Sequence, residues 1–436
     1  MVQLQTETHL PEEIQTDARP AKPLKIGYAW QYAGWVDHPP TATTLHVRAV
    51  VGTLQRRGHQ VRMVTVIGGK PQWSDDLEHW HPIETSQGRG KVFRLFERVV
   101  RGLQSRLHLP YLKFFESYRF AGACAQAFAG CDLIYERFWL SAYGALMAGR
   151  SLRIPVFYEV NGDLVSEYQQ LGIHLSRLQW AAAHFITRQM YLKAARVIAV
   201  TEQLREITTR RWRLPASKVS TVYNGAHVEL FSGAADGKDV RRQYDLGNDP
   251  LVTFVGSFQP WHGLDLLVEA FAILRRDGTP AKLVLVGDGQ TRTELEGQVR
   301  RLELGDCVVF TGAVPHNEIA GFLNASQVAV VNPRQSPAAM MASPLKLFEY
   351  MAAGKAIVAP QLPNLQQILT DHQNALLVPP NNAQALANAL GVLLSDEQLR
   401  NKLGKNAQVQ ALSVHSWERT VEQLESIFTD ELEKAR

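Results

Sequence analysis

Short apolar runs typical of buried β-strands alternate with amphipathic helical stretches along nearly the whole chain. Residues 24–28, 60–67, 134–135, 156–160, 197–200 and 219–223 form a first series of such runs, and residues 251–255, 282–286, 307–310, 328–331 and 356–359 form a second. A strand followed by a helix and another strand implies a parallel sheet. Two series of similar size therefore predict an α/β protein of two doubly wound, Rossmann-like domains that face a central cleft.

The spacing of the two series gives the expected domain boundaries. The first predicts an N-terminal domain over residues 23–228 and the second a C-terminal domain over residues 240–415, with the small and polar residues 232–239 as a connector. A last helical stretch, 416–432, lies beyond the second series, and we expect residues 416–436 to pack back on the first domain. Residues 1–22 carry four acidic residues and no apolar core, so we expect a disordered tail rather than a secretory signal.

Composition places the chain among globular proteins. It has 436 residues, 45% of them hydrophobic and 20% charged, and no apolar run approaches the ~18–20 residues of a membrane-spanning helix. Its three cysteines show no CxxC or Cys/His clustering, which argues against a disulfide framework or a zinc site and favours a cytoplasmic protein. The net charge is +4, but residues 1–225 carry +10 and the remainder −6. A basic half joined to an acidic half suggests that one half faces an anionic partner.

The segment SPLKLFEYMAAGK, residues 343–355, predicts a short helix with an anion site at its start. Ser343 is a good N-cap, Pro344 suits the first helical position, and Gly354 stands where a helix often ends in a left-handed residue. Lys346 places a positive charge in the first turn, where the helix dipole disfavours it, and such a local conflict is typical of a functional site. Unpaired backbone N–H groups together with Lys346 suit a phosphate. The alternative is an ordinary amphipathic helix with a surface lysine.

Three glycine-containing turns follow strand-like runs of the second series: VGSFQPWHG (255–263), VGDGQT (286–291) and FTGAV (310–314). Glycine permits close backbone approach, and the carboxyl ends of parallel strands share one edge of a sheet, so the three turns together predict a nucleotide cleft. His262 lies just before a helix, where an anion would bind, although a lone histidine is more often structural. The second turn is no dehydrogenase fingerprint, because Arg292 replaces the third glycine of GxGxxG.

Residues 89–119 interleave eight Lys and Arg with Phe, Leu and Val. Basic and aromatic residues on a helix suit an anionic membrane surface, which would place the protein peripherally on the inner face of the membrane. The alternative is a core-facing apolar stripe with a solvated basic face. No nucleic-acid recognition motif accompanies the charge, so no nucleic acid is expected as a partner.

Several segments together resemble retaining glycosyltransferases of family 4. They are VGSFQPWHGLDLLVEAF, LVLVGDG, VVFTGAVPHNEI and SPLKLFEYMAAGKAIVAP in the second half, and HVRAVVGTLQRRGHQV, DLIYERFWLSAYG, IPVFYEVNGDL and RVIAVTEQLRE in the first, so that the resemblance covers roughly residues 24–430. It implies a GT-B fold in which the first domain lies on the acceptor side and the second binds a nucleotide sugar. It also implies transfer with retention to form an α-glycoside, without a bound metal or other cofactor. The donor would be UDP- or GDP-linked, and the acceptor a lipid-linked compound, a glycan or polysaccharide, or a small metabolite.

The resemblance also implies roles for individual residues. Glu349 would accept hydrogen bonds from the nucleotide ribose, and backbone N–H groups near residues 343–346 would meet the diphosphate or the donor sugar. The expected catalytic residues are His262, Lys346, Glu349 and Asn161. The expected donor-binding residues are Gly256, Ser257, Gly263, Gly287, Asp288, Gly289, Gly312, Val314, Arg334, Ser343, Pro344 and Leu345. The expected acceptor-side residues are Thr43, His46, Glu136, Arg137 and Glu159, and no residue is expected to bind a metal.

Several positions depart from the family pattern. Met341 stands where many members have a glutamate, His262 where many have a lysine, and Thr41 and Ala42 replace a glycine-rich loop. These departures leave a second hypothesis open: a catalytically silent GT-B-like subunit that binds a partner or a polysaccharide. A third hypothesis, a sugar-nucleotide epimerase with the same fold, is disfavoured because the catalytic carboxylate and histidine pattern of that group is missing.

Overall fold

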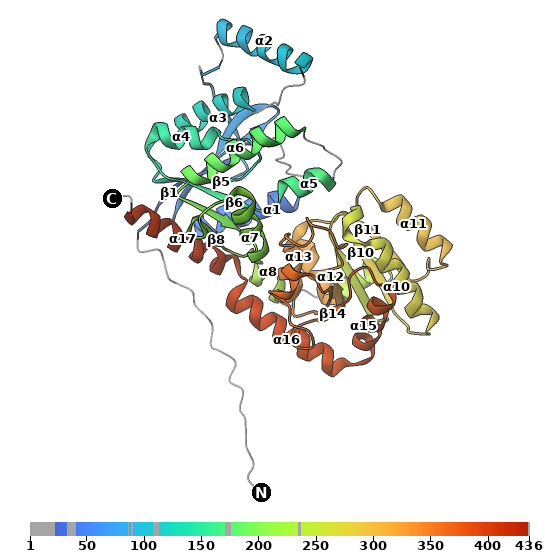
Figure 1. The fold of residues 1–436 in the computed structure, drawn as a ribbon. Helices are drawn as coiled ribbons and strands as arrows, with labels where there is room; N and C mark the ends of the chain where they lie inside the picture. The colour runs from blue at the N-terminus through green and yellow to red at the C-terminus, as the bar shows by residue number, and fades with distance from the viewer. Residues whose placement is uncertain are drawn as a thin grey trace.

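The computed structural model describes residues 22–32, 41–85, 87–88, 90–107, 113–170, 176–233 and 237–434. The expected disordered tail, 1–22, lies outside this part except for Lys22. Two α/β domains follow one another along the chain, one in the upper half of Figure 1 and the other at its lower right.

An eight-stranded sheet forms the centre of the N-terminal domain. Its strand order is β4-β3-β2-β1-β5-β6-β7-β8, and all pairings are parallel except β2–β3 and β3–β4. The strands are β1 (Lys25–Trp30), β2 (Gln60–Ile67), β3 (Lys70–Ser74), β4 (His81–Pro82), β5 (Leu133–Arg137), β6 (Val156–Val160), β7 (Arg196–Ala199) and β8 (Val219–Thr221).

A six-stranded parallel sheet forms the centre of the C-terminal domain, in the order β11-β10-β9-β12-β13-β14. The strands are β9 (Leu251–Val255), β10 (Lys282–Val286), β11 (Val308–Gly312), β12 (Val328–Val330), β13 (Ala356–Pro360) and β14 (Leu376–Val378). Counted from β9, this is the order 3-2-1-4-5-6 of dinucleotide-binding folds, which bind ligands where the order reverses, here between β9 and β12. The two sheets confirm the prediction of two doubly wound, Rossmann-like domains.

The hairpin of β2 and β3 was not predicted. Gly68 and Gly69 join the two strands with φ of +58° and +75°, and Ile67 pairs with Lys70 across the turn. A two-residue Gly-Gly loop is a strong hairpin signal, because its backbone twist matches that of the flanking strands. The Gly-Gly pair was therefore a usable hairpin signal in the sequence. It was missed because a helix, rather than another strand, was expected after β2.

Helices pack on both faces of each sheet because successive strand residues point to opposite sides. In the N-terminal domain, Ile134 and Tyr158 lie in the core that includes α3 and α4, whereas Tyr135 and Phe157 lie in the core that includes α1 and α17. The helices are α1 (Ala42–Arg56), α2 (Lys91–Leu107), α3 (Phe114–Ala127), α4 (Gly144–Leu152), α5 (Leu164–Gln170), α6 (Arg177–Lys193), α7 (Glu202–Trp212), α8 (Val228–Ser232), α9 (Gly237–Gln243), α10 (Leu264–Arg276), α11 (Arg292–Arg301), α12 (Ile319–Ala325), α13 (Leu345–Ala352), α14 (Pro363–Gln366), α15 (Ala383–Ser395), α16 (Glu397–Val414) and α17 (Trp417–Lys434).

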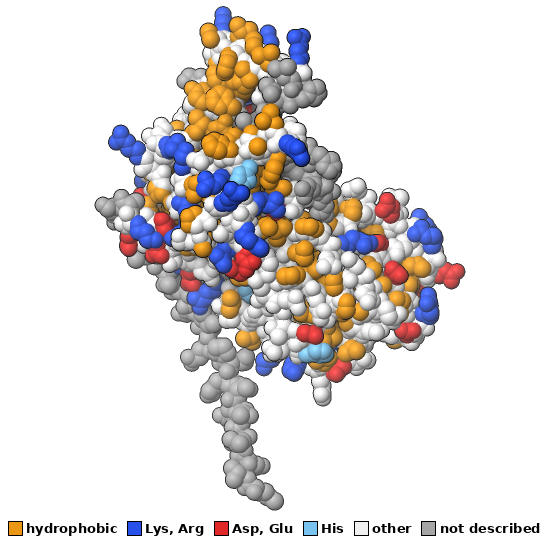
Figure 2. Space-filling view, viewed as in Figure 1, with side chains coloured by type: hydrophobic (Ala, Val, Ile, Leu, Met, Phe, Trp, Pro, Cys, Tyr) orange, Lys and Arg blue, Asp and Glu red, His pale blue; other side chains and the backbone are white. Residues whose placement is uncertain are grey.

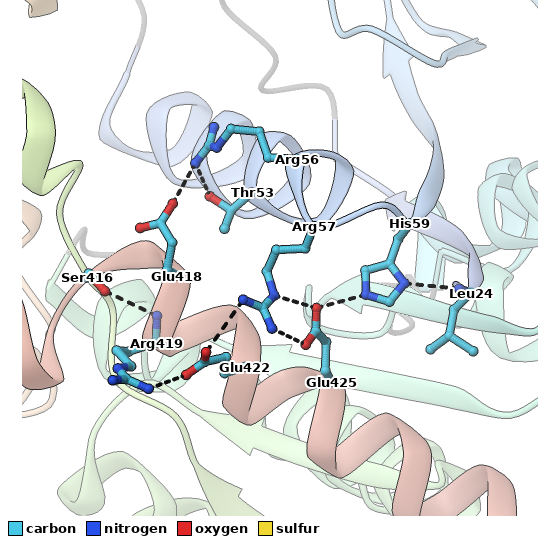
Figure 3. A network of polar contacts seen from close by, with 10 residues as sticks. All are labelled: Leu24, Thr53, Arg56, Arg57, His59, Ser416, Glu418, Arg419, Glu422 and Glu425. Atoms are coloured by element: carbon cyan, nitrogen blue, oxygen red, sulfur yellow. Dashed lines mark hydrogen bonds and ion pairs between the residues drawn. The ribbon is translucent and has the colours of Figure 1, made fainter. Parts of the chain in front are cut away.

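The last helix, α17, returns to the N-terminal domain and packs beside α1, as predicted (Figure 3). Glu425 of α17 accepts two hydrogen bonds from the guanidinium of Arg57, at 2.7 and 2.8 Å. It also accepts one from Nε2 of His59 at 2.8 Å, while Nδ1 of His59 accepts the backbone N–H of Leu24 at 3.0 Å. One buried carboxylate thus joins α17 to the end of α1 and to the residue that precedes β1.

Candidate functional site

A cavity of about 620 Å³ lies between the domains, at the carboxyl ends of their strands. The N-terminal domain lines it with the start of α1, the last residue of β5 and residues that follow β6 and β8, namely Thr41, Ala42, Thr43, Leu45, His46, Arg137, Asn161 and Asn224. The C-terminal domain lines it with the three predicted glycine turns and the start of α13, including Gly256, Ser257, His262, Gly287, Asp288, Val314, His316, Ser343, Pro344, Leu345, Lys346 and Glu349. The structure therefore brings most of the predicted site residues to one place.

The helix predicted from residue 343 starts one position later than expected. Pro344, with φ −72° and ψ 118°, is the N-cap, and α13 begins at Leu345, so Ser343 is not the cap. The reason lies in the preceding segment: Asn224 donates to the carbonyl of Ser343 at 3.2 Å and Asn364 to that of Ala342 at 2.6 Å, which holds the chain extended. The Ser343 hydroxyl is buried without a hydrogen-bond partner among the described residues.

Lys346, in the first turn of α13, is the least satisfied cation of the cavity wall. Its Nζ is shielded from solvent, has no hydrogen-bond partner in the described part of the chain, and lies 3.8 Å from the centre of the Phe254 ring. Gly256 makes room for it, because a Cβ there would stand 2.6 Å from Nζ, and its φ of +138° favours glycine. Burial lowers the pKa of Lys346 to about 7, although the Glu349 charge opposes the shift. A bound anion would both pair with this ammonium and raise its pKa.

His262 stands beside Lys346 in a fixed tautomer. Its Nδ1 lies 2.6 Å from the carbonyl oxygen of Ser257, and since a carbonyl can only accept, Nδ1 carries the proton. Burial and the neighbouring Lys346 charge lower the pKa of the imidazole to about 3, so the ring is neutral. Nε2 then presents a lone pair. Because its N–H is already used, His262 is suited to accept from a hydroxyl rather than to bind the anion expected at this position.

Glu349 is held by a histidine that the sequence analysis did not select. His316, which follows β11, donates from Nε2 to Oε1 of Glu349 at 2.8 Å. Both residues line the cavity, and Glu349 is only 8% exposed. A histidine in the loop after a strand of the second series was the available signal, because such loops share the edge of the sheet at which ligands bind.

The acceptor-side residues form a second polar group across the cavity. Nε2 of His46 donates to Oε1 of Glu159 at 2.7 Å, and Arg137 lies 3.8 Å from the other carboxylate oxygen. Burial would raise the pKa of Glu159, but His46 and Arg137 outweigh it and lower the pKa to about 2. Glu159 is thus a charged residue behind His46 rather than part of the wall. Nδ1 of His46 and Nδ2 of Asn161 are buried without partners among the described residues.

Several predicted site residues lie outside the cavity wall. Glu136 points to the other face of the N-terminal sheet, where it is fully buried and where burial raises its pKa well above the usual range. This follows from strand alternation, because Arg137, the next residue of β5, faces the cavity. Arg334 pairs with Asp265 instead of facing the cleft. Gly263, Gly289 and Gly312 have φ of +60°, +158° and +76° and shape the surrounding turns without lining the cavity themselves.

Among the described residues, no three His, Cys, Asp or Glu side chains are arranged to hold a metal ion. The expectation that no metal is needed stays a prediction.

Two family models match the chain. The model Glycosyltransferase Family 4 matches residues 43–230, and the model Glycosyl transferases group 1 matches residues 237–410. The two matched ranges follow the two domains and their two halves of the cavity.

Characterised relatives are glycosyltransferases as well. The chain is 26% identical to Alpha-D-kanosaminyltransferase of Streptomyces kanamyceticus over 292 residues, which are 66% of this chain and 74% of the relative. It is 26% identical to D-inositol 3-phosphate glycosyltransferase of Corynebacterium glutamicum over 311 residues, which are 69% of this chain and 72% of the relative.

Solved structures share the fold. Sucrose-phosphate synthase of Thermosynechococcus elongatus superposes with a TM-score of 0.69 at 24% identity, covering 94% of this chain and 100% of that one. Anabaena HepE, solved in complex with UDP, superposes with a TM-score of 0.68 at 19% identity, covering 93% and 100%. The chain thus carries a Glycosyltransferase Family 4 domain followed by a Glycosyl transferases group 1 domain, and its two sheets have the arrangement of the GT-B fold.

Proposed function

We propose that the cavity is the active site of a retaining glycosyltransferase, which moves a sugar from a UDP- or GDP-linked donor to an acceptor hydroxyl and forms an α-glycoside. The observation that carries the proposal is the set of buried polar atoms without partners that converge there: Lys346 Nζ, Ser343 Oγ, Asn161 Nδ2 and His46 Nδ1. Buried polar groups in proteins are nearly always hydrogen-bonded, so a polar ligand is expected to satisfy these four.

The donor occupies the C-terminal side of the cavity. The free N–H groups at the start of α13 and the Lys346 ammonium bind the diphosphate, and Glu349, oriented by His316, accepts from the ribose hydroxyls. The UDP bound to Anabaena HepE, a protein of the same fold, supports this class of donor. Charge that develops on the leaving diphosphate is stabilised by Lys346 and by these fixed N–H dipoles.

The acceptor approaches from the N-terminal side, past His46 and Asn161. Retention here needs no covalent carboxylate intermediate. The carboxylates in the described wall are engaged elsewhere, since Asp288 pairs with Arg292 and Glu349 with His316. The transition state has oxocarbenium-like character, and the neutral His262 accepts a hydrogen bond from a sugar hydroxyl through Nε2. Lipid-linked compounds, glycans and small metabolites are the acceptor classes proposed.

The test begins with a thermal-shift screen of UDP, GDP and their sugars in the presence of EDTA, without acceptor. A ligand at about a hundred times its Kd adds about 2.7 kcal/mol to stability and raises the melting temperature. Stabilisation by one nucleotide, followed by slow release of the nucleoside diphosphate from its sugar, is the expected result. Binding without any turnover, or no stabilisation by any nucleotide, would contradict the proposed transfer and favour the silent subunit that binds a partner or a polysaccharide.

A further inference from the structure

Helix α2 turns its apolar side away from the protein. Val92 is 83% exposed, and Leu95, Phe96, Val99 and Leu103 are each at least 50% exposed. Figure 1 shows α2 at the far end of the N-terminal domain, and Figure 2 shows a cluster of hydrophobic side chains over this end of the molecule. A surface helix normally buries its apolar stripe, so this orientation needs a specific cause.

The cause lies in the inner side of the same helix. Phe93 stacks on Tyr118 of α3 with ring centres 5.2 Å apart. Glu97 accepts from Arg119 of α3 at 2.7 Å and from Arg101 at 2.9 Å, and Arg119 lowers the pKa of Glu97 to about 2. One aromatic stack and a charged hydrogen-bond network thus fix the rotation of α2 and leave the apolar row facing solvent.

The outer side carries cations but no carboxylate. Lys91, Arg94, Arg98 and Arg106 are exposed, and none of the four is paired with a carboxylate in the described part of the chain. At 100° per residue, Lys91 and Arg98 fall beside the apolar row, Arg94 falls farther round the helix, and Arg106 falls within the row near its C-terminal end. Glu97, the acidic residue of α2, is turned inward by Arg119.

We propose that α2 is a membrane-docking element: its row of Val92, Leu95, Phe96, Val99 and Leu103 enters the interface of an anionic lipid bilayer while Lys91, Arg94, Arg98 and Arg106 contact the lipid phosphates. A helix that lies in the interface buries its apolar face at the level of the headgroups and gains from basic residues beside it. The described helices include none long and apolar enough to cross a bilayer. The surface belongs to the domain on the proposed acceptor side of the cavity.

A second copy of the chain fits this surface less well. Apposing two α2 helices would bring two sets of unpaired cations together, and like charges in contact are destabilising. A stable interface also buries ~800 Å² on each partner, more than five side chains in one row provide.

The experiment is vesicle flotation with the full chain, without donor or acceptor, so that its outcome is independent of the proposed glycosyl transfer. Phosphatidylcholine vesicles with and without 30% phosphatidylglycerol are compared at low and high salt. The apolar variant combines Phe96→Ser with Val99→Ser, and its matched control combines Val409→Ser with Leu412→Ser, two exposed apolar residues of α16. The charge variant combines Arg94→Gln with Arg98→Gln, and its control combines Lys402→Gln with Lys405→Gln on α16.

The expected result is binding to phosphatidylglycerol vesicles that falls with salt and is about tenfold weaker in either α2 variant. Both α16 controls should bind like the unaltered chain. Binding that is absent, independent of salt, or equally reduced in the controls would overturn the proposal. A dimer in sedimentation velocity that both α2 variants abolish would also overturn it, because the face would then bind a second copy. Vesicle binding that appears only after removal of residues 1–21 would overturn it as well, because the face would then be assigned to the N-terminal segment.

Discussion

At the scale of single residues, a substitution of Lys346 should change the stability of the protein and its binding of a nucleoside diphosphate in opposite directions. Its pKa of about 7 lies below the unfolded value of about 10.4, so the unfolded chain binds more protons between these limits and the free energy of unfolding should rise with pH across them. Lys346→Met should therefore raise the free energy of unfolding at pH 7, by on the order of 2 kcal/mol, because it removes the cost of burying an unpaired amine. The same variant should weaken binding of a nucleoside diphosphate at least tenfold, since it removes the cation.

Calorimetry checks the second half of this prediction. A diphosphate that pairs with Lys346 raises its pKa, so binding at pH 8 should take up close to one proton, measured as a heat that differs between Tris and HEPES buffers. The uptake should disappear in Lys346→Met and persist in Lys402→Met, a surface control on α16. Equal proton uptake in both variants would show that Lys346 does not meet the ligand.

The sequence identified Lys346 as a functional residue through its unfavourable place in the first turn of a helix. It did not reveal that Phe254 and Gly256 enclose the ammonium, because these residues lie about ninety positions away and only the fold joins them. It placed Glu136 in the site for a related reason: a one-residue uncertainty in strand register exchanges the two faces of a sheet. Residue types were thus predictable, and the direction of each side chain was not.

At the scale of elements, the attachment of α17 rests largely on Glu425. Glu425→Gln should lower the free energy of unfolding of the N-terminal domain by about 2 kcal/mol at pH 7, because Arg57 loses two charged hydrogen bonds and keeps the ion pair with Glu422 at 3.5 Å. Burial raises the pKa of Glu425, but the hydrogen bonds from His59 and Arg57 outweigh it and the pKa is lowered overall. The stabilisation by Glu425 is therefore fully present above about pH 4.3, the pKa of Glu in the unfolded chain, and is lost as pH falls through the lower pKa of the folded state. Denaturant titrations at pH 7 and at pH 3 measure the free energies of unfolding of the variant and the parent, and their difference should be smaller at pH 3.

Glu418→Gln supplies the control on the same helix. Glu418 pairs with Arg56, whose side chain is 54% exposed, so the loss should stay within about 0.5 kcal/mol. Equal losses in the two variants would contradict the assigned role of Glu425.

The helix itself and its return to the first domain were predictable from sequence, since it lies beyond the second β/α series. The partners were not, because Arg57 and His59 are more than 360 positions away.

At the scale of the whole molecule, the two segments that connect the domains are hydrogen-bonded to each other. The backbone N–H of Ala226 donates to the carbonyl of His415 at 2.9 Å, and the N–H of Trp417 donates to the carbonyl of Ala226 at 3.2 Å. Gly225 permits this approach, because a Cβ there would stand 2.5 Å from the backbone carbon of Ser416. This junction sets how the two halves of the cavity face each other, and no local sequence pattern predicts it.

Gly225→Ala should therefore separate donor binding from transfer. The donor contacts proposed here lie in the C-terminal domain, so nucleoside diphosphate affinity should stay within about twofold, whereas transfer should fall at least tenfold, because a displacement of about 1 Å between reacting groups is costly. Gly305→Ala is the control, since a Cβ there has open space around it. Calorimetry gives the affinity, and turnover of the donor identified in the thermal-shift screen gives the rate. If affinity and rate fell together, the junction would serve stability alone; if neither changed, the two passages would not set the geometry of the cleft.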